Sequence, residues 1–258
     1  MEERITKDEL YKEIKYEHVI AAIQEYRKDV GDWGNHKRAD YYIYYKNEYY
    51  PSREIIRRAY GILHPDSEVT SKFLTGKGGK QYIVDALEKK EFIVVNLKDK
   101  KEFEIESDES FIIGINNEFL NYEYVEYTPK PVKKQEPLES KGRIVYIRRK
   151  EISINALKRA NYLCEIDNRH PGFIRKSNGT NYTEPHHLIP MHMQWYFEFS
   201  LDVEANIISL CSNCHNLLHY GADEEKVEVL RKLYELRKNE LKEAGLEISF
   251  NKLLSMYA

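Results

Sequence analysis

Apolar residues recur at helical spacing in several separate segments of the chain. Between Tyr16 and Arg27, Val19, Ile20 and Ile23 fall on one face, which predicts an amphipathic helix. The same spacing, together with proline, serine and glycine at the ends, predicts further helices from Pro51, up to Ala86, over 151–161, from Cys214 and over 224–244. Alternating or β-branched apolar residues predict strands at 41–50, 92–95, 183–189 and 206–210.

A proline-rich segment divides these elements into two groups. Thr128–Pro137 contains three prolines and several lysines but almost no apolar residues, so it cannot bury a core and is predicted to be a semi-stiff linker. We therefore predict an α+β fold with an N-terminal domain over residues 1–125, a linker over 126–142 and a second domain over 143–258.

Composition narrows the class of protein. The sequence has no apolar run long enough to cross a bilayer, and its charged start, Met1-Glu2-Glu3-Arg4, does not resemble a secretory signal. We therefore expect a cytoplasmic protein with no membrane partner. The net charge of -3 argues against a surface that is basic throughout, so any contact with nucleic acid must be local.

The cysteines predict a zinc site. Cys211 and Cys214 form a Cys-x-x-Cys pair, a spacing that brings two thiolates to one tetrahedral ion, and Cys164 supplies a third sulfur. Asp167 and His170 are the candidates for the fourth ligand. We favour His170, because imidazole is the commoner partner of three thiolates. The alternative is a set of three reduced cysteines that bind no metal.

Two histidine pairs predict a second metal site nearby. His215 and His219 are four residues apart on the predicted helix and therefore share a face, so they can chelate one ion. His186 and His187 are adjacent on the predicted strand and point to opposite sides, so one can join the ion while the other faces substrate and water. A neutral imidazole is well suited to deprotonating water. The alternative is a set of structural histidines.

The segments Glu184-Pro185-His186-His187-Leu188-Ile189-Pro190 and Leu210-Cys211-Ser212-Asn213-Cys214-His215-Asn216-Leu217-Leu218-His219, with Asn206 between them, resemble the HNH (ββα-metal) endonuclease signature in its zinc-stapled form. The resemblance implies that His187 is the general base and that Asn206 holds the loop between the strands. It also implies a catalytic Mg²⁺, Mn²⁺ or Ni²⁺ bound by His186, His215 and His219, beside a structural zinc.

The N-terminal domain has a weaker resemblance to that of restriction endonucleases that act on modified DNA and carry a C-terminal HNH domain. It rests on the predicted helix at 16–27, the tyrosine-rich segment at 41–50, the Pro51-Ser52-Arg53-Glu54 helix start and the glycine-rich turn at 73–80. The tyrosines are candidates either for base stacking or for a place in the core of a strand. The candidate DNA contacts are Arg53, Arg57, Arg58, Arg148 and Arg149.

The sequence therefore predicts a metal-dependent endonuclease that hydrolyses phosphodiester bonds in DNA, with a restriction or defence role. One alternative is a non-catalytic, zinc-stapled DNA-binding protein. A second alternative is a toxin-like effector nuclease whose first domain binds a partner protein. Because a single HNH site cuts one strand, double-strand cleavage would call for a homodimer.

Overall fold

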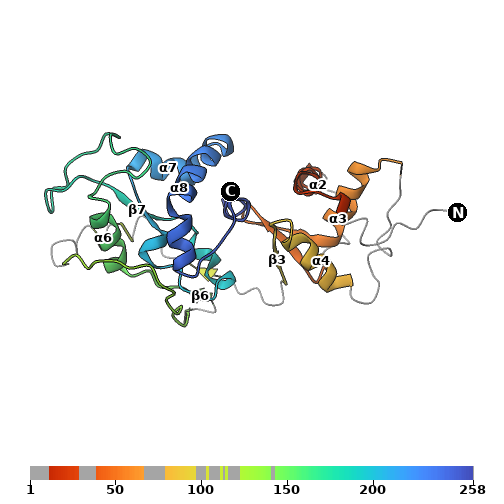
Figure 1. Ribbon diagram of the computed structural model, residues 1–258, viewed down its shortest axis with the longest axis horizontal. Helices are drawn as coiled ribbons and strands as arrows, with labels where there is room; N and C mark the ends of the chain where they lie inside the picture. Colours follow the sequence, from red (N-terminus) through yellow and green to blue (C-terminus); the bar gives the residue numbers. More distant parts are fainter. Residues whose placement is uncertain are drawn as a thin grey trace. The chain divides into compact units, whose positions relative to one another are not determined.

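The computed structural model describes residues 12–28, 39–66, 79–96, 103–104, 111–112, 114–115, 123–140 and 143–257. The chain forms two compact units, Met1–Lys100 and Lys101–Ala258. The first unit combines helices with one small sheet, and the second combines helices with two (Figure 1). The fold is therefore mixed helix and sheet, as the sequence predicts, but the division between the units lies earlier in the chain than the proline-rich segment.

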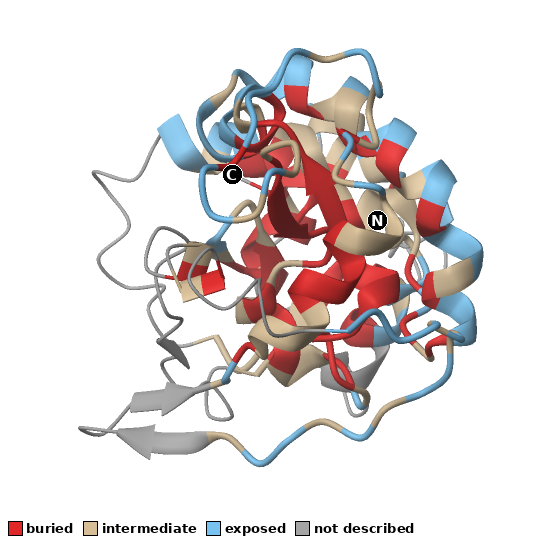
Figure 2. Cartoon of the chain, turned by 90° about the vertical axis from the view of Figure 1, so that its left-hand side faces the viewer, coloured by how far each residue is buried: buried red, intermediate tan, exposed pale blue. Residues whose placement is uncertain are grey.

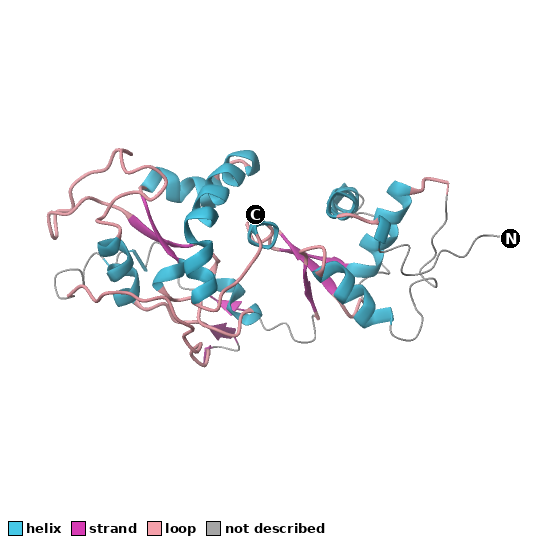
Figure 3. Cartoon of the chain, viewed as in Figure 1, coloured by secondary structure: helices cyan, strands magenta, loops and turns pink. Residues whose placement is uncertain are grey.

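The first unit contains a three-stranded antiparallel sheet in the order β2-β1-β3. Its strands are β1 (Tyr42–Tyr45), β2 (Glu48–Pro51) and β3 (Ile93–Val95). Its helices are α2 (Tyr16–Lys28), α3 (Ser52–Leu63) and α4 (Gly79–Glu88) (Figure 3). The predicted helix from Tyr16 and the predicted helix start after Pro51 are confirmed. The predicted glycine-rich turn at 73–80 lies almost wholly outside the described residues.

The tyrosine-rich segment is a hairpin of two strands, so the prediction of one strand is wrong. Lys46 and Asn47 have φ angles of 49° and 59°, and Tyr45 pairs with Glu48 across the turn. Two consecutive residues in the left-handed region form the tight turn that suits a two-residue hairpin, and asparagine tolerates this conformation well. The chain therefore reverses in the middle of the segment.

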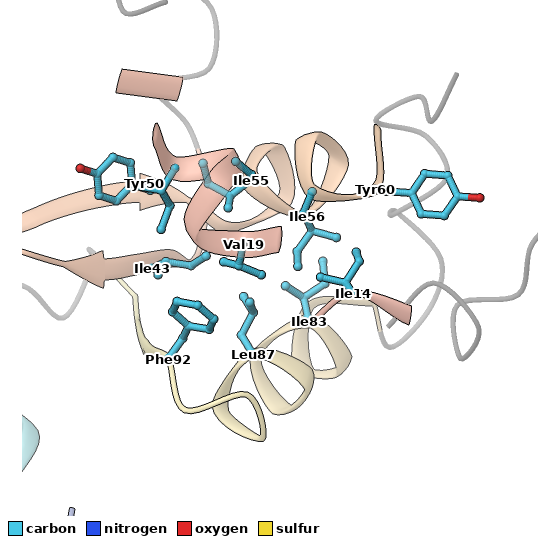
Figure 4. Packing of buried hydrophobic residues seen from close by; sticks show 13 residues of the cluster. Ile14, Val19, Ile43, Tyr50, Ile55, Ile56, Tyr60, Ile83, Leu87 and Phe92 are labelled. Atoms are coloured by element: carbon cyan, nitrogen blue, oxygen red, sulfur yellow. The ribbon is translucent and has the colours of Figure 1, made fainter. Parts of the chain in front are cut away.

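The core of the first unit lies between the sheet and its helices. Figure 4 shows Val19 from α2, Ile55 from α3 and Leu87 from α4 pointing towards Ile43 and Phe92, and all five side chains are fully buried. Three tyrosines of the hairpin are also buried in the described structure, namely Tyr42, Tyr44 and Tyr50. Their burial favours the core interpretation of this segment over a role in base stacking.

The second unit contains two small sheets. One has the order β4-β6-β5, built from β4 (Phe103–Glu104), β5 (Leu138–Ser140) and β6 (Arg143–Val145). The other pairs β7 (Glu184–His187) with β8 (Ile207–Leu210), and every residue of these two strands is buried (Figure 2). The helices are α6 (Lys150–Arg159), η4 (Met191–Tyr196), η5 (Glu204–Asn206), α7 (Ser212–Tyr220), α8 (Asp223–Glu243) and α9 (Phe250–Leu254).

Helix α8 follows the predicted helix and ends at the predicted glycine. Gly245 has a φ of +75°, and a Cβ there would lie 2.5 Å from the ring of Phe199. Both the backbone conformation and the close aromatic contact therefore call for glycine at this C-terminus. No helix within the described ranges is long and apolar enough to cross a membrane.

The proline-rich segment is part of the second unit and is bonded to a later segment of it. The backbone N–H of Ser200 donates to the carbonyl of Val132 over 2.8 Å, Lys133 forms a β-bridge with Phe199, and Lys134 Nζ donates to the carbonyl of Phe197 over 2.8 Å. The sequence predicts a semi-stiff linker here. The structure pairs this segment with residues 197–200, so that the backbone groups of the two segments satisfy one another.

Candidate functional site

Strands β7 and β8 and helix α7 bring the predicted histidines together. In the antiparallel pair, His186 lies opposite Ile208 and His187 lies opposite Ile207. Helix α7 begins directly after β8, with Cys211 at its N-cap. Residues four apart on a helix lie one above the other, so His215 and His219 share the face that meets β7.

Three histidines form a cluster that could hold a metal ion. One ring nitrogen each from His186, His215 and His219 lies within 4.8 Å of the others. The ring centroid of His186 is 5.2 Å from that of His215 and 5.2 Å from that of His219. His186 and His215 are buried, whereas His219 is exposed. The cluster is therefore closed on the protein side and open to solvent beside His219, the arrangement that leaves positions for water and substrate.

Two neighbouring groups fix which ring nitrogens could bind the ion. The carboxylate of Glu184 lies 2.9 Å from His215 Nδ1 and accepts a hydrogen bond of 2.8 Å from the hydroxyl of Ser212. Burial raises the pKa of Glu184, but these two hydrogen bonds outweigh it and hold the pKa below its ordinary value. Glu184 is therefore an ionised acceptor, so Nδ1 of His215 carries the proton and Nε2 is left for a metal.

Tyr257, near the end of the chain, fixes which ring nitrogen of His186 could bind the ion. Its hydroxyl donates to the carbonyl of Leu188 over 2.7 Å and lies 3.0 Å from Nε2 of His186. Since the phenol has one proton, it accepts the hydrogen bond from Nε2, and Nδ1 of His186 keeps the lone pair. Burial, reinforced by the neighbouring histidines, lowers the pKa of His186 well below its ordinary value. A neutral ring is the form that binds a metal, so the donor set fits a divalent ion.

His187, the predicted general base, lies within hydrogen-bond distance of a buried carboxylate. Its Nε2 lies 3.1 Å from Oδ1 of Asp202, and both side chains are buried. No motif in the sequence pointed to Asp202. This residue lies in a loop fifteen positions after His187, and that separation is not a spacing that predicts contact.

Asn206 joins the segment that follows β7 to the loop that precedes β8. Its side-chain oxygen accepts from the N–H of Ile189 over 2.7 Å, and its amide nitrogen donates to the carbonyls of Ile189 and Leu201, each over 2.9 Å. The residue is fully buried. An amide that satisfies three backbone groups on two segments fixes the distance between those segments. This is the kind of contact that the resemblance implies for Asn206.

The second cluster holds the predicted zinc ligands. One donor atom each from Cys164, His170, Cys211 and Cys214 lies within 4.8 Å of the others. His170 Nδ1 is 3.2 Å from the sulfur of Cys214 and 3.7 Å from that of Cys211. Three sulfurs and one imidazole at this spacing form a site that could bind zinc.

Asp167, the other candidate for the fourth ligand, is not among the four residues whose donor atoms converge. Its carboxylate forms a two-pronged ion pair with Arg169, with an oxygen 2.8 Å from Nη2 and the other 3.0 Å from Nε. Hydrogen bonds from the Arg169 side chain and backbone hold the pKa of this carboxyl well below its usual range. The described structure therefore favours His170 as the fourth donor.

The arginines predicted to contact DNA lie in different surroundings. Arg57 and Arg58 both pair with Glu54, at 2.7 Å and 2.9 Å. Arg58 and Arg148 are each only 8% exposed, and the guanidinium of Arg148 lies 4.1 Å from the ring centre of Phe111. Contact with a phosphate would require these two side chains to leave buried positions. Arg53, Arg57 and Arg149 are partly exposed.

Comparison with known proteins gives two matches. Residues 12–96 match the family model described as the ScoMcrA-like, N-terminal head domain. A segment of 87 residues is 31% identical to the type IV methyl-directed restriction enzyme EcoKMcrA of Escherichia coli strain K12. This segment covers 33% of the chain and 29% of that enzyme. The first unit is thus similar to a domain of McrA-like proteins, in agreement with the resemblance found in its sequence.

Proposed function

We propose that this protein is a metal-dependent endonuclease of the HNH type that hydrolyses phosphodiester bonds in DNA. The observation that carries the proposal is the convergence of one ring nitrogen each from His186, His215 and His219, with His187 next to His186 on β7. Two antiparallel strands followed by a helix, with a second Cys/His cluster at the start of that helix, match the architecture that the sequence signature implies. The similarity of one segment to a restriction enzyme supports the same class of reaction.

The chemistry assigned to the chain is the activation of water. His187 takes a proton from a water molecule, whose oxygen then forms a bond to phosphorus, while one phosphorus–oxygen ester bond breaks and the departing oxygen takes a proton from solvent. A divalent ion bound by the three histidines would stabilise negative charge on the phosphate and on the departing oxygen. Because all three ligands are neutral, the ion would keep its full charge for this purpose.

The donor set also bears on which ion is used. Imidazole nitrogen suits nickel and other transition metals, whereas Mg²⁺ prefers oxygen ligands and keeps several waters. We therefore expect Ni²⁺ and Mn²⁺ to support cleavage at lower concentrations than Mg²⁺.

We further propose that the target is modified DNA and that the first unit takes part in its recognition. Support comes from the head-domain match over residues 12–96 and from the methyl-directed activity in the name of the Escherichia coli relative. An HNH site acts on the backbone that every DNA shares, so selectivity must arise elsewhere in the protein. A restriction or defence role follows from selectivity of this kind.

The first test is cleavage of plasmid DNA by the purified full chain with Mg²⁺, Mn²⁺ or Ni²⁺. We expect nicking or cutting with at least one ion, and we expect His187→Ala to abolish it without loss of zinc or of the folded structure. His64→Gln, a partly exposed histidine of the first unit, is the matched control and should cleave like the wild type. Cleavage by His187→Ala would show that the assigned base is wrong. DNA binding without cleavage in any ion would favour a non-catalytic DNA-binding protein.

The second test compares unmodified, methylated, hydroxymethylated and phosphorothioate DNA as substrates. We expect binding and cleavage to depend on at least one of these modifications. If both ignore modification in every case, the proposed selectivity fails while the nuclease assignment stands. In that outcome, a first unit that binds a partner protein becomes the better interpretation.

A further inference from the structure

Asp202 lies between the predicted base and an arginine from a distant part of the chain. Its Oδ1 is 3.1 Å from Nε2 of His187. Its Oδ2 accepts from the backbone N–H of Arg149 over 2.9 Å and from Nε of Arg149 over 3.3 Å. The backbone carbonyl of Asp202 accepts from Nη2 of the same arginine over 3.1 Å. The carboxylate is thus held at one oxygen by Arg149 and presents the other oxygen to His187.

We propose that Asp202 is the positioning residue of the active site, and that it fixes both the ring orientation and the tautomer of His187. This inference rests on the proposed function. It assigns to Asp202 and Arg149 a role that neither the HNH-like signature nor the comparisons with known proteins indicate.

The donors and acceptors around Asp202 decide the tautomer. Two N–H groups of Arg149 point at Oδ2, and the oxygens of a carboxylate can only accept hydrogen bonds. The nitrogen of His187 that faces Oδ1 must therefore carry the proton. Nδ1 of His187 is left with the lone pair, and it is the atom that can take a proton from water.

The loop that carries Asp202 is fixed on both sides. The N–H of Asp202 donates to the hydroxyl of Ser200 over 3.2 Å, and the N–H of Leu201 donates to the side-chain oxygen of Gln194 over 2.7 Å. The carbonyl of Leu201 accepts from Asn206. Asp202 is only 3% exposed. A buried carboxylate on a pinned loop holds its partner in one orientation, which is what a base requires of its neighbours.

The competing interpretation is an ion pair with Arg149 that serves folding alone. The two interpretations differ at Nε2 of His187. A structural ion pair needs only Oδ2, whereas the positioning role requires Oδ1 to accept a proton-bearing Nε2.

The direct test measures the wild-type protein. Nitrogen-15 NMR of the histidine side chains in the full-length, catalytic-metal-free protein at neutral pH reports which ring nitrogen of His187 carries the proton, with His187→Gln used to assign the signal. We expect protonated Nε2 and unprotonated Nδ1. Protonation at Nδ1 in the neutral ring would overturn the proposal.

The kinetic test is Asp202→Asn. The donors of Arg149 would hold the amide oxygen, so the amide nitrogen would face Nε2 of His187 and favour the opposite tautomer. We expect kcat to fall by about 10³- to 10⁴-fold, as happens when the aspartate of a Ser-His-Asp triad is changed to asparagine, with KM nearly unchanged. The NMR signal of His187 should move to protonated Nδ1. The variant Arg149→Ala keeps the backbone N–H that holds Oδ2 and should cause a smaller loss of kcat.

The two single variants separate this inference from the proposed function. If His187→Ala is inactive while Asp202→Asn retains wild-type kcat, the positioning role is wrong and the nuclease assignment survives. If His187→Ala is active, the proposed function itself fails. Should Asp202→Asn prove unfolded, the NMR measurement on the wild type and the Arg149→Ala kinetics still decide the question.

Discussion

The second unit contains two Cys/His clusters that differ in how completely the protein surrounds them. The sulfur-rich cluster offers four donors, and its three cysteines are buried. The histidine cluster offers three donors, and one of them, His219, is exposed. Four protein ligands close a tetrahedral site, whereas three leave room for water or substrate. The number and the exposure of the donors therefore distinguish a cluster suited to stabilising the fold from one that is open to substrate.

The largest effect is expected from removing a donor of the sulfur-rich cluster. Cys214→Ser should lose the zinc and lower Tm by about 10 °C or more, because a structural zinc contributes several kcal/mol and each kcal/mol shifts Tm by about 2–4 °C in a domain of this size. Elemental analysis and thermal unfolding measure the two losses. Asp167→Asn is the control and should keep its zinc, whereas His170→Ala should not. A stable Cys214→Ser protein with normal zinc content would contradict the structural role.

Removal of a donor from the histidine cluster should affect the stability of the fold less but should reduce activity strongly. His219→Ala removes an exposed ligand, so affinity for the catalytic ion should fall by about 100-fold or more, and cleavage should fall with it. Zinc content and Tm should stay close to wild type. Isothermal titration with Ni²⁺ and plasmid cleavage are the measurements. Tyr220→Ala, which changes the exposed neighbour, should bind and cleave normally. Equal metal affinity in both variants would remove His219 from the ligand set.

The smallest effect is expected from a residue that orients a ligand. Tyr257→Phe removes the hydroxyl that accepts from Nε2 of His186, and loss of such a partner weakens metal binding by about 10- to 100-fold. Titration with Ni²⁺ measures this, and added metal should restore cleavage. Tyr234→Phe, which removes a hydroxyl bonded to the carbonyl of Ile248, is the matched control. A Tyr257→Phe protein with unchanged affinity for Ni²⁺ would show that the hydroxyl does not determine the orientation of the His186 ring.

Local patterns were sufficient where the structure is local. The helices over Tyr16–Lys28, Lys150–Arg159 and Asp223–Glu243 follow from their apolar spacing, because a helix repeats every few residues. The spacing of Cys211, Cys214, His215 and His219 implies two ligand pairs for the same reason. The pattern failed at Lys46 and Asn47, where a two-residue turn inside a run of tyrosines carries no apolar signal.

Charged residues show the limit of patterns most clearly. The basic side chains of Arg58 and Arg148 suggest phosphate contacts, yet one is buried against Glu54 and the other over the ring of Phe111. Long side chains can turn inward when a partner compensates for the loss of water, and sequence spacing does not reveal that partner.

Spacing in the sequence pointed to the residues of both Cys/His clusters and to the strands and helices that carry most of them. It could not find the groups that orient the ligands. Asp202, Arg149 and Tyr257 lie in separate segments. The packing of the second unit brings Asp202 to His187, Arg149 to Asp202 and Tyr257 to His186. The identity of the candidate ligands follows from spacing within one element. The tautomer and orientation of each ring depend on contacts between elements, and these contacts form only when the chain folds.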